Sequence, residues 1–392
     1  MTEKNPIELL RGIRVVSMEQ YIGAPYCTSL LADAGAEVIK VEHGQGDPRR
    51  DYEPMRGEGP GNLSGGFASY NRGKRSVTID ITTDEGAADL AALLATADVF
   101  VSNLRPGALA KRGFGRERLS TDFPRLVVCE ISGFGQTGPY AQWPAFDSVI
   151  QAMSGLSSLI GSTPDEPPQL APMGTMDLLG GLYGALGILS ALVGRERTGR
   201  GTHVDASMFD IGAAFLERPL TLHEFTGDVP TRGADEFSPV GTFRAGDGGW
   251  VSVVIPTDEM WRRSCVAMGR PDLVTHPDID TVVKRARRMK DVVLPEFTAW
   301  ASTMTRDEAI EALRAAGQPA GAVLDIGEVR ADAHLAARGL FVPVQHDEAR
   351  NADGTVVSLP RTPLLYDGVG AVPGPIPPLG EASIDELLQG RP

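Results

Sequence analysis

The sequence predicts an α/β protein whose main domain is built around a mostly parallel sheet. Short runs of β-branched residues alternate with apolar helical stretches from the start of the chain to residue 131. This alternation is typical of βαβ units, whose connecting helices cover both faces of a parallel sheet. A length of 392 residues, of which 42% are apolar, is comfortable for two domains.

The elements of the first part of the chain can be placed in order. The β-branched runs predict strands at 13–18, 36–42, 77–81, 98–102 and 126–131, and apolar spacing predicts helices at 25–34 and 84–95. Gly35 is expected to end the first helix. A further strand at 202–207 leads into an apolar helical stretch that runs to about Glu217.

The texture of the sequence changes after this stretch. Residues 226–239 are rich in Gly, Pro and charge, which is typical of a linker. A strand at 249–255 and helices at 257–268, 284–304 and 305–316 follow, and Thr305 with Glu308 predicts a capping box. The last sixty residues are Pro-rich and end in a helix at 383–388. We therefore expect a large domain at 1–225, a small α/β domain at 226–329, and a C-terminal segment at 330–392 that returns to the large domain.

Bulk properties exclude several classes of protein. The net charge of −14 argues against a nucleic-acid binder, although local basic clusters still allow a small anionic ligand. Cys27, Cys129 and Cys265 lie far apart and are expected to be reduced thiols, with no disulfide and no metal site. The first residues lack the apolar core of a signal peptide, so a cytoplasmic enzyme is expected.

The uncharged segment 178–194 raises the question of a membrane span. Its length is at the lower edge of what a spanning helix needs. Its four internal glycines instead favour a helix that packs tightly inside a protein, and no membrane partner is expected.

A glycine pattern, GFGQTG at 133–138, follows the strand at 126–131 and matches the spacing of a dinucleotide-binding loop. Such a loop belongs at the first βα turn and must lead directly into a helix. Here Pro139 and Pro144 follow the glycines, which disfavours a helix at this point. The glycines are therefore interpreted as a turn before an extended loop, and NAD binding is disfavoured.

Several long blocks carry a family resemblance in the right order: residues 12–42, 70–81, 97–115, 133–155, 176–208, 317–329, 334–341 and 376–381. Together they resemble the family III CoA-transferases, the CaiB/BaiF group, which includes formyl-CoA transferase, carnitine CoA-transferases and the α-methylacyl-CoA racemases. The resemblance implies a Rossmann-like large domain, coenzyme A as substrate and product without a permanently bound cofactor, and an interlocked homodimer.

Asp177 is the candidate catalytic residue. It stands immediately before the uncharged helix, where a capping role is expected, and free amides there would lower its pKa. An ionised aspartate can attack a thioester to give a mixed anhydride. A plain capping aspartate is the alternative, but Asp177 is similar to the nucleophilic aspartate of the family.

The resemblance also implies a set of residues that bind CoA or line the substrate site. CoA carries phosphates, so basic residues along its path are expected, although pairs of basic residues are often only solvated surface charge. The set comprises Tyr21, Ile22, His43, Lys74, Arg75, Asn103, Lys111, Arg112, Phe146 and Asp147. Ile22 stands where some transferases have a glutamine, and His43 where an arginine can occur.

The racemase branch is the alternative within the family. There, a histidine before the aspartate of a Gly-His-Asp motif takes part in moving the α-proton of an acyl-CoA, which needs a base on each face. Phe146 stands before Asp147 here, so the sequence favours CoA transfer from an acyl-CoA to a carboxylic acid. A non-catalytic acyl-CoA binding protein is a further alternative.

Overall fold

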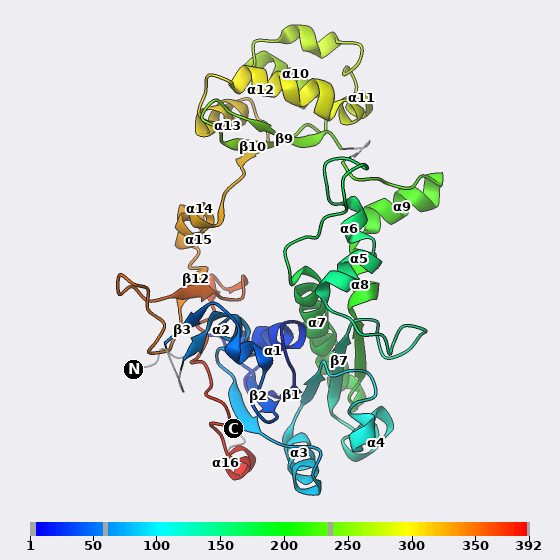
Figure 1. Cartoon of the computed structure of the whole chain (residues 1–392), viewed down its shortest axis with the longest axis vertical. Helices are drawn as coiled ribbons and strands as arrows, with labels where there is room; N and C mark the ends of the chain where they lie inside the picture. Colours follow the sequence, from blue (N-terminus) through cyan, green and yellow to red (C-terminus); the bar gives the residue numbers. More distant parts are fainter. Residues whose placement is uncertain (1–4, 58–61, 234–237, 390–392) are drawn as a thin grey trace. The chain divides into compact units, whose positions relative to one another are not determined.

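The computed structural model describes residues 5–57, 62–233 and 238–389. It divides into two compact units (Figure 1). The large unit contains the described residues up to Ser158, then Gln169–Arg218, and the chain from His334 onward; the smaller unit contains Leu159–Pro168 and the described part of Pro219–Ala333. These boundaries differ from the predicted ones, because residues 159–168, 219–225 and 330–333 group with the smaller unit.

The large unit is built around a six-stranded parallel sheet in the order β5-β2-β1-β6-β7-β8. This is the order of a doubly wound sheet, whose switch point lies between β1 and β6. The predicted strands are present, although β5, at Arg75–Thr78, both begins and ends before the predicted strand at 77–81. The strands are β1 (Arg14–Met18), β2 (Glu37–Glu42), β5 (Arg75–Thr78), β6 (Val99–Ser102), β7 (Val127–Ser132) and β8 (His203–Ser207).

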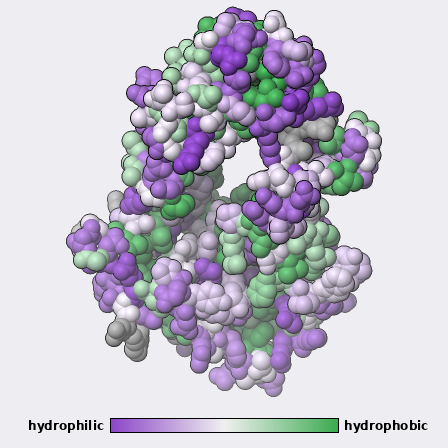
Figure 2. Space-filling model, turned by 45° about the horizontal axis from the view of Figure 1, so that its top comes forward, coloured by the Kyte–Doolittle hydropathy of each residue, from purple (hydrophilic) through white to green (hydrophobic). Residues whose placement is uncertain are grey.

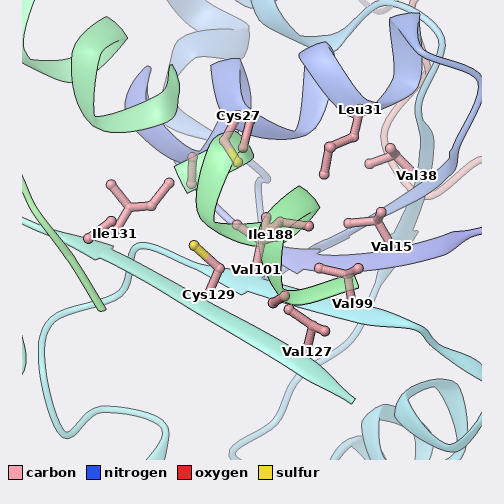
Figure 3. Close-up of a cluster of buried hydrophobic side chains, with 14 of the residues drawn as sticks. Val15, Cys27, Leu31, Val38, Val99, Val101, Val127, Cys129, Ile131 and Ile188 are labelled. Carbon is pink, nitrogen blue, oxygen red and sulfur yellow. The ribbon is translucent and has the colours of Figure 1, made fainter. Parts of the chain in front are cut away.

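Successive residues of the strands point to opposite faces of this sheet. Val15 and Val99 belong to one buried cluster, which is formed with α1, α7 and α8 (Figure 3). Their neighbours Val16 and Phe100 belong to a second cluster, formed with α3, α4 and α16. Helices therefore cover both faces of the sheet, as predicted. They are α1 (Gly23–Asp33), α3 (Asp84–Thr96), α4 (Arg116–Asp122), α7 (Thr175–Thr198), α8 (Met208–Phe215) and α16 (Ile384–Gln389).

Helix α7 is long and apolar enough to cross a membrane by length and composition alone, and 44% of its most apolar window is buried. Its glycines allow close packing inside the large unit. A Cβ atom at Gly181 would lie 2.5 Å from the carbonyl oxygen of Gly23, and one at Gly184 would lie 2.7 Å from Ile131 Cδ1. The glycine face of the helix therefore packs in the core of the large unit, against α1 and β7.

The smaller unit has its own antiparallel sheet, in the order β11-β10-β9. Residues 245–249 form a hairpin turn between β9 and β10. The predicted capping box of Thr305 and Glu308 is confirmed. Phe243 stacks on Phe297 in a separate core. The elements are β9 (Val240–Arg244), β10 (Trp250–Val254), α10 (Asp258–Ala267), η3 (Pro271–Thr275), α11 (Val282–Arg287), η4 (Met289–Val293), α12 (Leu294–Ala301), α13 (Arg306–Ala315), β11 (Ala320–Ala322) and α14 (Ile326–Ala331). Residues 234–237 of the predicted linker lie outside the described residues.

The C-terminal segment packs on the large unit. The guanidinium of Arg14 donates to the carbonyl oxygen of Leu387, and Asp33 accepts from the hydroxyl and amide of Thr362.

Hydrophilic residues cover much of the face in Figure 2, and hydrophobic residues gather there in separate patches. The remaining elements are η1 (Pro48–Asp51), β3 (Met55–Arg56), β4 (Leu63–Ser64), α2 (Gly65–Asn71), η2 (Ala110–Arg112), α5 (Asp147–Met153), α6 (Leu156–Leu159), α9 (Glu217–Thr226), α15 (Ala333–Ala337), β12 (Phe341–Pro343), β13 (Ser358–Pro360), β14 (Leu365–Tyr366) and β15 (Val369–Gly370).

Candidate active site

Asp177 lies in the first turn of α7, beside the start of α1. The N-cap of α7 is Gly174, at φ 93°, so the prediction that Asp177 caps the helix is wrong. A Cβ atom at Gly23, the first residue of α1, would lie 3.6 Å from Asp177 Oδ1. The partly buried carboxyl of Asp177 therefore faces a position where glycine keeps the space open.

Asp147 supplies the acceptor for the start of α7. Its Oδ1 accepts from the amides of Met176 at 2.6 Å and Asp177 at 3.3 Å, and its Oδ2 accepts from Gln151 Nε2 at 2.7 Å. Gln151 Oε1 in turn accepts from the amide of Ala171 at 2.8 Å. The buried side chain of Asp147 thus ties α5 to the segment that leads into α7.

The pKa of Asp177 is raised to about 7, chiefly because the carboxyl is buried and next because the carboxylate of Asp147 lies nearby; the charge of Arg49 opposes this rise. The expectation that free helix amides lower this pKa is therefore wrong. Two of those amides already bond to Asp147, which adds a like charge instead.

The GFGQTG turn explains how Asp147 reaches this place. A Cβ atom at Gly133 would lie 2.3 Å from the Cβ of Ala145, so only glycine lets the end of the loop fold back over its beginning. No helix forms between β7 and α5, as predicted. The loop ends at Phe146, which is 65% exposed, and the buried Asp147 follows as the first residue of α5.

The loop after β1 carries Tyr21 in a left-handed conformation, at φ 64°, which is unusual for a non-glycine residue. Asp47 Oδ1 accepts from the amide of Tyr21 at 3.2 Å and holds this conformation. The ring of Tyr21 meets that of Phe146 edge to face, with centroids 5.8 Å apart. Ile22 follows at the N-cap of α1, where its Cδ1 would lie 3.4 Å from a Cβ atom at Gly174. Tyr21, Ile22 and Phe146 therefore gather around the starts of α1, α5 and α7.

Asn103 lies at the switch point of the sheet. Its Oδ1 accepts from the amide of Gln20 at 2.9 Å, and its Nδ2 donates to the carbonyl of Gln20 at 2.8 Å. This pair of bonds joins the loop after β6 to the loop that carries Tyr21. Ligands of doubly wound sheets bind at this position, beyond the carboxyl ends of the strands.

His43, Lys111 and Arg112 also follow strands at their carboxyl ends. All three are exposed, and His43 Nδ1 lies 3.5 Å from Asp80 Oδ1. His43 directly follows β2, whereas Lys111 and Arg112 lie in η2, between β6 and α4. Parallel strands place their carboxyl ends at one edge of a sheet, so the segments that carry these residues begin at the same edge as those that carry Tyr21 and Asn103.

Lys74 and Arg75 lie differently from what the resemblance implies. The ammonium of Lys74 is buried and donates to Glu19 Oε1, the carbonyl of Pro25 and Asn71 Oδ1, so all three of its donors are used. Arg75 pairs with Glu381 and Glu386 of the C-terminal segment. These contacts favour structural roles for both side chains over direct contact with a phosphate. Lys74 binds Glu19, which precedes the Tyr21 loop, and Arg75 binds the C-terminal segment.

Sequence reasoning missed Arg49 and the residues that hold it. The guanidinium of Arg49 lies 5.6 Å from the ring centroid of Tyr52 and 5.5 Å from that of Tyr70. Its Nε donates to the carbonyl of Gly66 at 2.9 Å. The basic pair at 49–50 was the available signal, but nothing in the sequence indicates which of the two arginines affects the pKa of Asp177.

The arrangement suits covalent chemistry at a carboxylate. With a pKa of about 7, Asp177 can ionise near neutral pH, and the charge of Arg49 favours the ionised form. The aromatic pair of Tyr21 and Phe146 lies in the loops that lead into α1 and α5, at a sheet edge that can receive a ligand. Such a carboxylate is a nucleophile toward thioesters or anhydrides.

Comparison with known proteins agrees with this chemistry. Residues 10–383 match the model of CoA-transferase family III. The chain is 34% identical to the succinyl-CoA–L-malate CoA-transferase alpha subunit of Chloroflexus aurantiacus, over 97% of this chain and 88% of that protein. It is 34% identical to the acetyl-CoA:oxalate CoA-transferase of Acetobacter aceti, over 87% of this chain and 88% of that protein. The crystal structure of a CaiB/BaiF family protein from Brucella suis superposes with a TM-score of 0.82 at 30% identity, over 97% of both chains. The chain therefore belongs to CoA-transferase family III, the CaiB/BaiF family, and is a CoA-transferase.

Proposed function

We propose that this enzyme transfers CoA from an acyl-CoA to a carboxylic acid through covalent intermediates on Asp177. The observation that carries the proposal is the carboxyl of Asp177, partly buried at the start of α7, with a pKa of about 7. At neutral pH a large fraction of this group is ionised, and it is a stronger base than an ordinary aspartate.

The transfer proceeds in two halves that mirror each other. The carboxylate of Asp177 attacks the thioester carbonyl, CoA leaves as the thiolate, and a mixed anhydride remains. The thiolate attacks the aspartyl carbonyl of that anhydride, which releases the donor acid and leaves an aspartyl-CoA thioester. The acceptor carboxylate then attacks this thioester and forms a second anhydride with Asp177. The thiolate returns to the acyl carbon of the acceptor, giving the new acyl-CoA and free Asp177.

The long life of these intermediates depends on keeping water away. An aspartyl-CoA thioester hydrolyses if water reaches it before the acceptor does. Tyr21 and Phe146 form an apolar edge-to-face pair at the site, which supports this role for the loops after β1 and β7.

The relatives suggest the class of acid. Two of them are named for transfer to L-malate and to oxalate, with succinyl-CoA and acetyl-CoA as the named CoA thioesters. We therefore propose short dicarboxylic acids as acceptors. CoA itself would lie along the sheet edge that carries Asn103, His43, Lys111 and Arg112.

A homodimer is the proposed assembly, and one surface of α7 supports it. Leu182, Leu186, Leu189 and Val193 follow each other at helical spacing and are all exposed, Val193 at 70%. An exposed apolar stripe of this kind on a core helix is typical of a subunit interface. Sedimentation of the enzyme with and without Leu186→Glu and Val193→Glu tests this assembly.

The covalent mechanism is tested by trapping. Incubation with an acyl-CoA and hydroxylamine is expected to modify Asp177, which peptide mass spectrometry detects. Asp177→Ala is expected to abolish CoA exchange without loss of the fold. Near-native turnover by Asp177→Ala, or an active enzyme in which hydroxylamine leaves Asp177 unmodified, contradicts the mechanism.

A further inference from the structure

Two neighbouring arginines in η1 have opposite surroundings. Arg50 is fully engaged, since its Nε and Nη2 donate to Glu42 and its Nη1 donates to the carbonyl of Pro377. Arg49 uses only its Nε, which donates to the carbonyl of Gly66. Within residues 5–57, 62–233 and 238–389, no carboxylate lies within ion-pair distance of Arg49.

The guanidinium of Arg49 is nevertheless held firmly. Tyr52 and Tyr70 both lie within the range of cation–π contact. Asp47 Oδ1 accepts from the amide of Arg49 at 3.0 Å while it also holds the amide of Tyr21. A partly buried cation with a fixed orientation and unused Nη donors is suited to a planar, doubly bonding anion.

A chain of ring contacts links Arg49 to the reacting group. Its guanidinium lies over Tyr52, the Tyr52 ring meets that of Tyr21 with centroids 6.4 Å apart, and Tyr21 packs on Phe146, the residue before Asp147, which accepts from the amide of Asp177. The charge of Arg49 also opposes the rise in the pKa of both Asp177 and Tyr70. In the resting enzyme Asp177 is the nearby negative charge. Once Asp177 carries CoA as a thioester it is neutral, and Arg49 then lacks a compensating charge at the step when the acceptor acid arrives.

We propose that Arg49 binds the non-reacting carboxylate of a short dicarboxylic acid and thereby selects diacids over monoacids. A carboxylate held by the two Nη groups of a guanidinium has less electron density to share, so the bound carboxylate is the one that does not attack. The other carboxylate of the same acid then faces Asp177. This inference rests on the proposed transfer function and adds its specificity.

The experiment compares acids of matched length with acetyl-CoA as donor, which carries no second carboxylate. Succinate, L-malate and glutarate are compared with butyrate and valerate for the parent enzyme, Arg49→Met and Arg49→Lys. We expect Arg49→Met to lower the ratio of kcat/KM for diacid over monoacid about ten- to a hundredfold, the usual effect of losing a charged hydrogen-bond pair. Arg49→Lys keeps the positive charge but not the paired Nη donors of the guanidinium, and it is expected to lower this ratio less than Arg49→Met does.

Arg116→Met, which replaces an exposed arginine in α4, is the matched control and is expected to leave the ratio unchanged. Thermal unfolding of each variant separates a folding defect from a binding defect. An unchanged ratio in folded Arg49→Met overturns the assignment, as does a parent enzyme that prefers butyrate. A parent enzyme that transfers CoA to no acid contradicts the proposed function instead, so the two failures are distinguishable.

Discussion

The carboxylate of Asp147 accepts a hydrogen bond from the amide of Asp177 at 3.3 Å and a shorter one, at 2.6 Å, from that of Met176. One aspartate therefore occupies the helix-terminal donors that would otherwise stabilise the other. The result is a nucleophile with a raised pKa, in which the negative charge is less stabilised and more reactive.

Activity is expected to depend on the ionisation of Asp177. Burial and the charge of Asp147 on α5 raise the pKa of Asp177 to about 7, and the charge of Arg49 on η1 opposes this rise. The neighbouring Tyr70 on α2 and Gly23 on α1 add no charge at neutral pH. Because the ionised form is the nucleophile, kcat/KM should fall below pH 7, about tenfold per pH unit in the acid limb. A pH profile from 5 to 9 measures this, and a flat profile down to pH 5 contradicts it.

Asp147→Asn should move that limb toward lower pH, because it removes the like charge beside Asp177. It should also destabilise the fold by about 1–3 kcal/mol. The amide nitrogen of the new asparagine cannot accept a hydrogen bond from Gln151 Nε2, so one buried donor is left without an acceptor. Thermal unfolding and the pH profile of kcat/KM are the two measurements. Asp210→Asn, at an exposed aspartate in the first turn of α8, is the control that should change neither.

Removing the nucleophile should stabilise the protein at high pH. The folded pKa of Asp177 lies above the usual 3.8, so the folded state holds the proton more tightly, and that stability is lost as pH rises through 7. Asp177→Asn has no such loss and should unfold at a higher temperature than the parent at pH 8. The difference between the two pKa values sets an upper limit of about 4 kcal/mol. The gain should shrink at pH 5, and equal gains at both pH values would count against a raised pKa.

Asn103 and Lys111 are expected to act on CoA binding more than on chemistry. Contacts made equally in the ground and transition states raise KM when removed, with little change in kcat. Lys111→Ala should therefore raise KM for acyl-CoA, and the effect should weaken in high salt because Lys111 is exposed. Asn103→Ala should in addition loosen the Tyr21 loop, which Asn103 holds through Gln20. An unchanged KM in Lys111→Ala removes Lys111 from the CoA site.

The sequence was sufficient to predict the parallel sheet of the large unit, but not which residue caps α7. Strand and helix alternation predicted the parallel sheet because the local period is set by short stretches of chain. The pKa of Asp177 and the burial of Lys74 depend on residues such as Asp147 and Glu19, which the fold brings together from distant parts of the sequence. Arg49 was missed for the same reason, since its surroundings differ from those of Arg50 only in the folded chain.

The last prediction concerns the alternative reaction of the family, racemisation at the α-carbon of an acyl-CoA. Inversion requires one group that removes a proton and a second that delivers one to the opposite face. Asp177 can serve on one side, but Phe146 presents a hydrocarbon ring that packs against Tyr21 and has no exchangeable proton. The loss of one acid–base partner typically lowers the rate about a hundred- to ten-thousandfold, so racemisation should be a trace activity. Incubation of a 2-methylacyl-CoA in D₂O, followed by NMR or mass spectrometry, measures deuterium uptake at the α-carbon. Rapid uptake that disappears in Asp177→Ala would mean that another base replaces the missing histidine and that this enzyme belongs to the racemase branch.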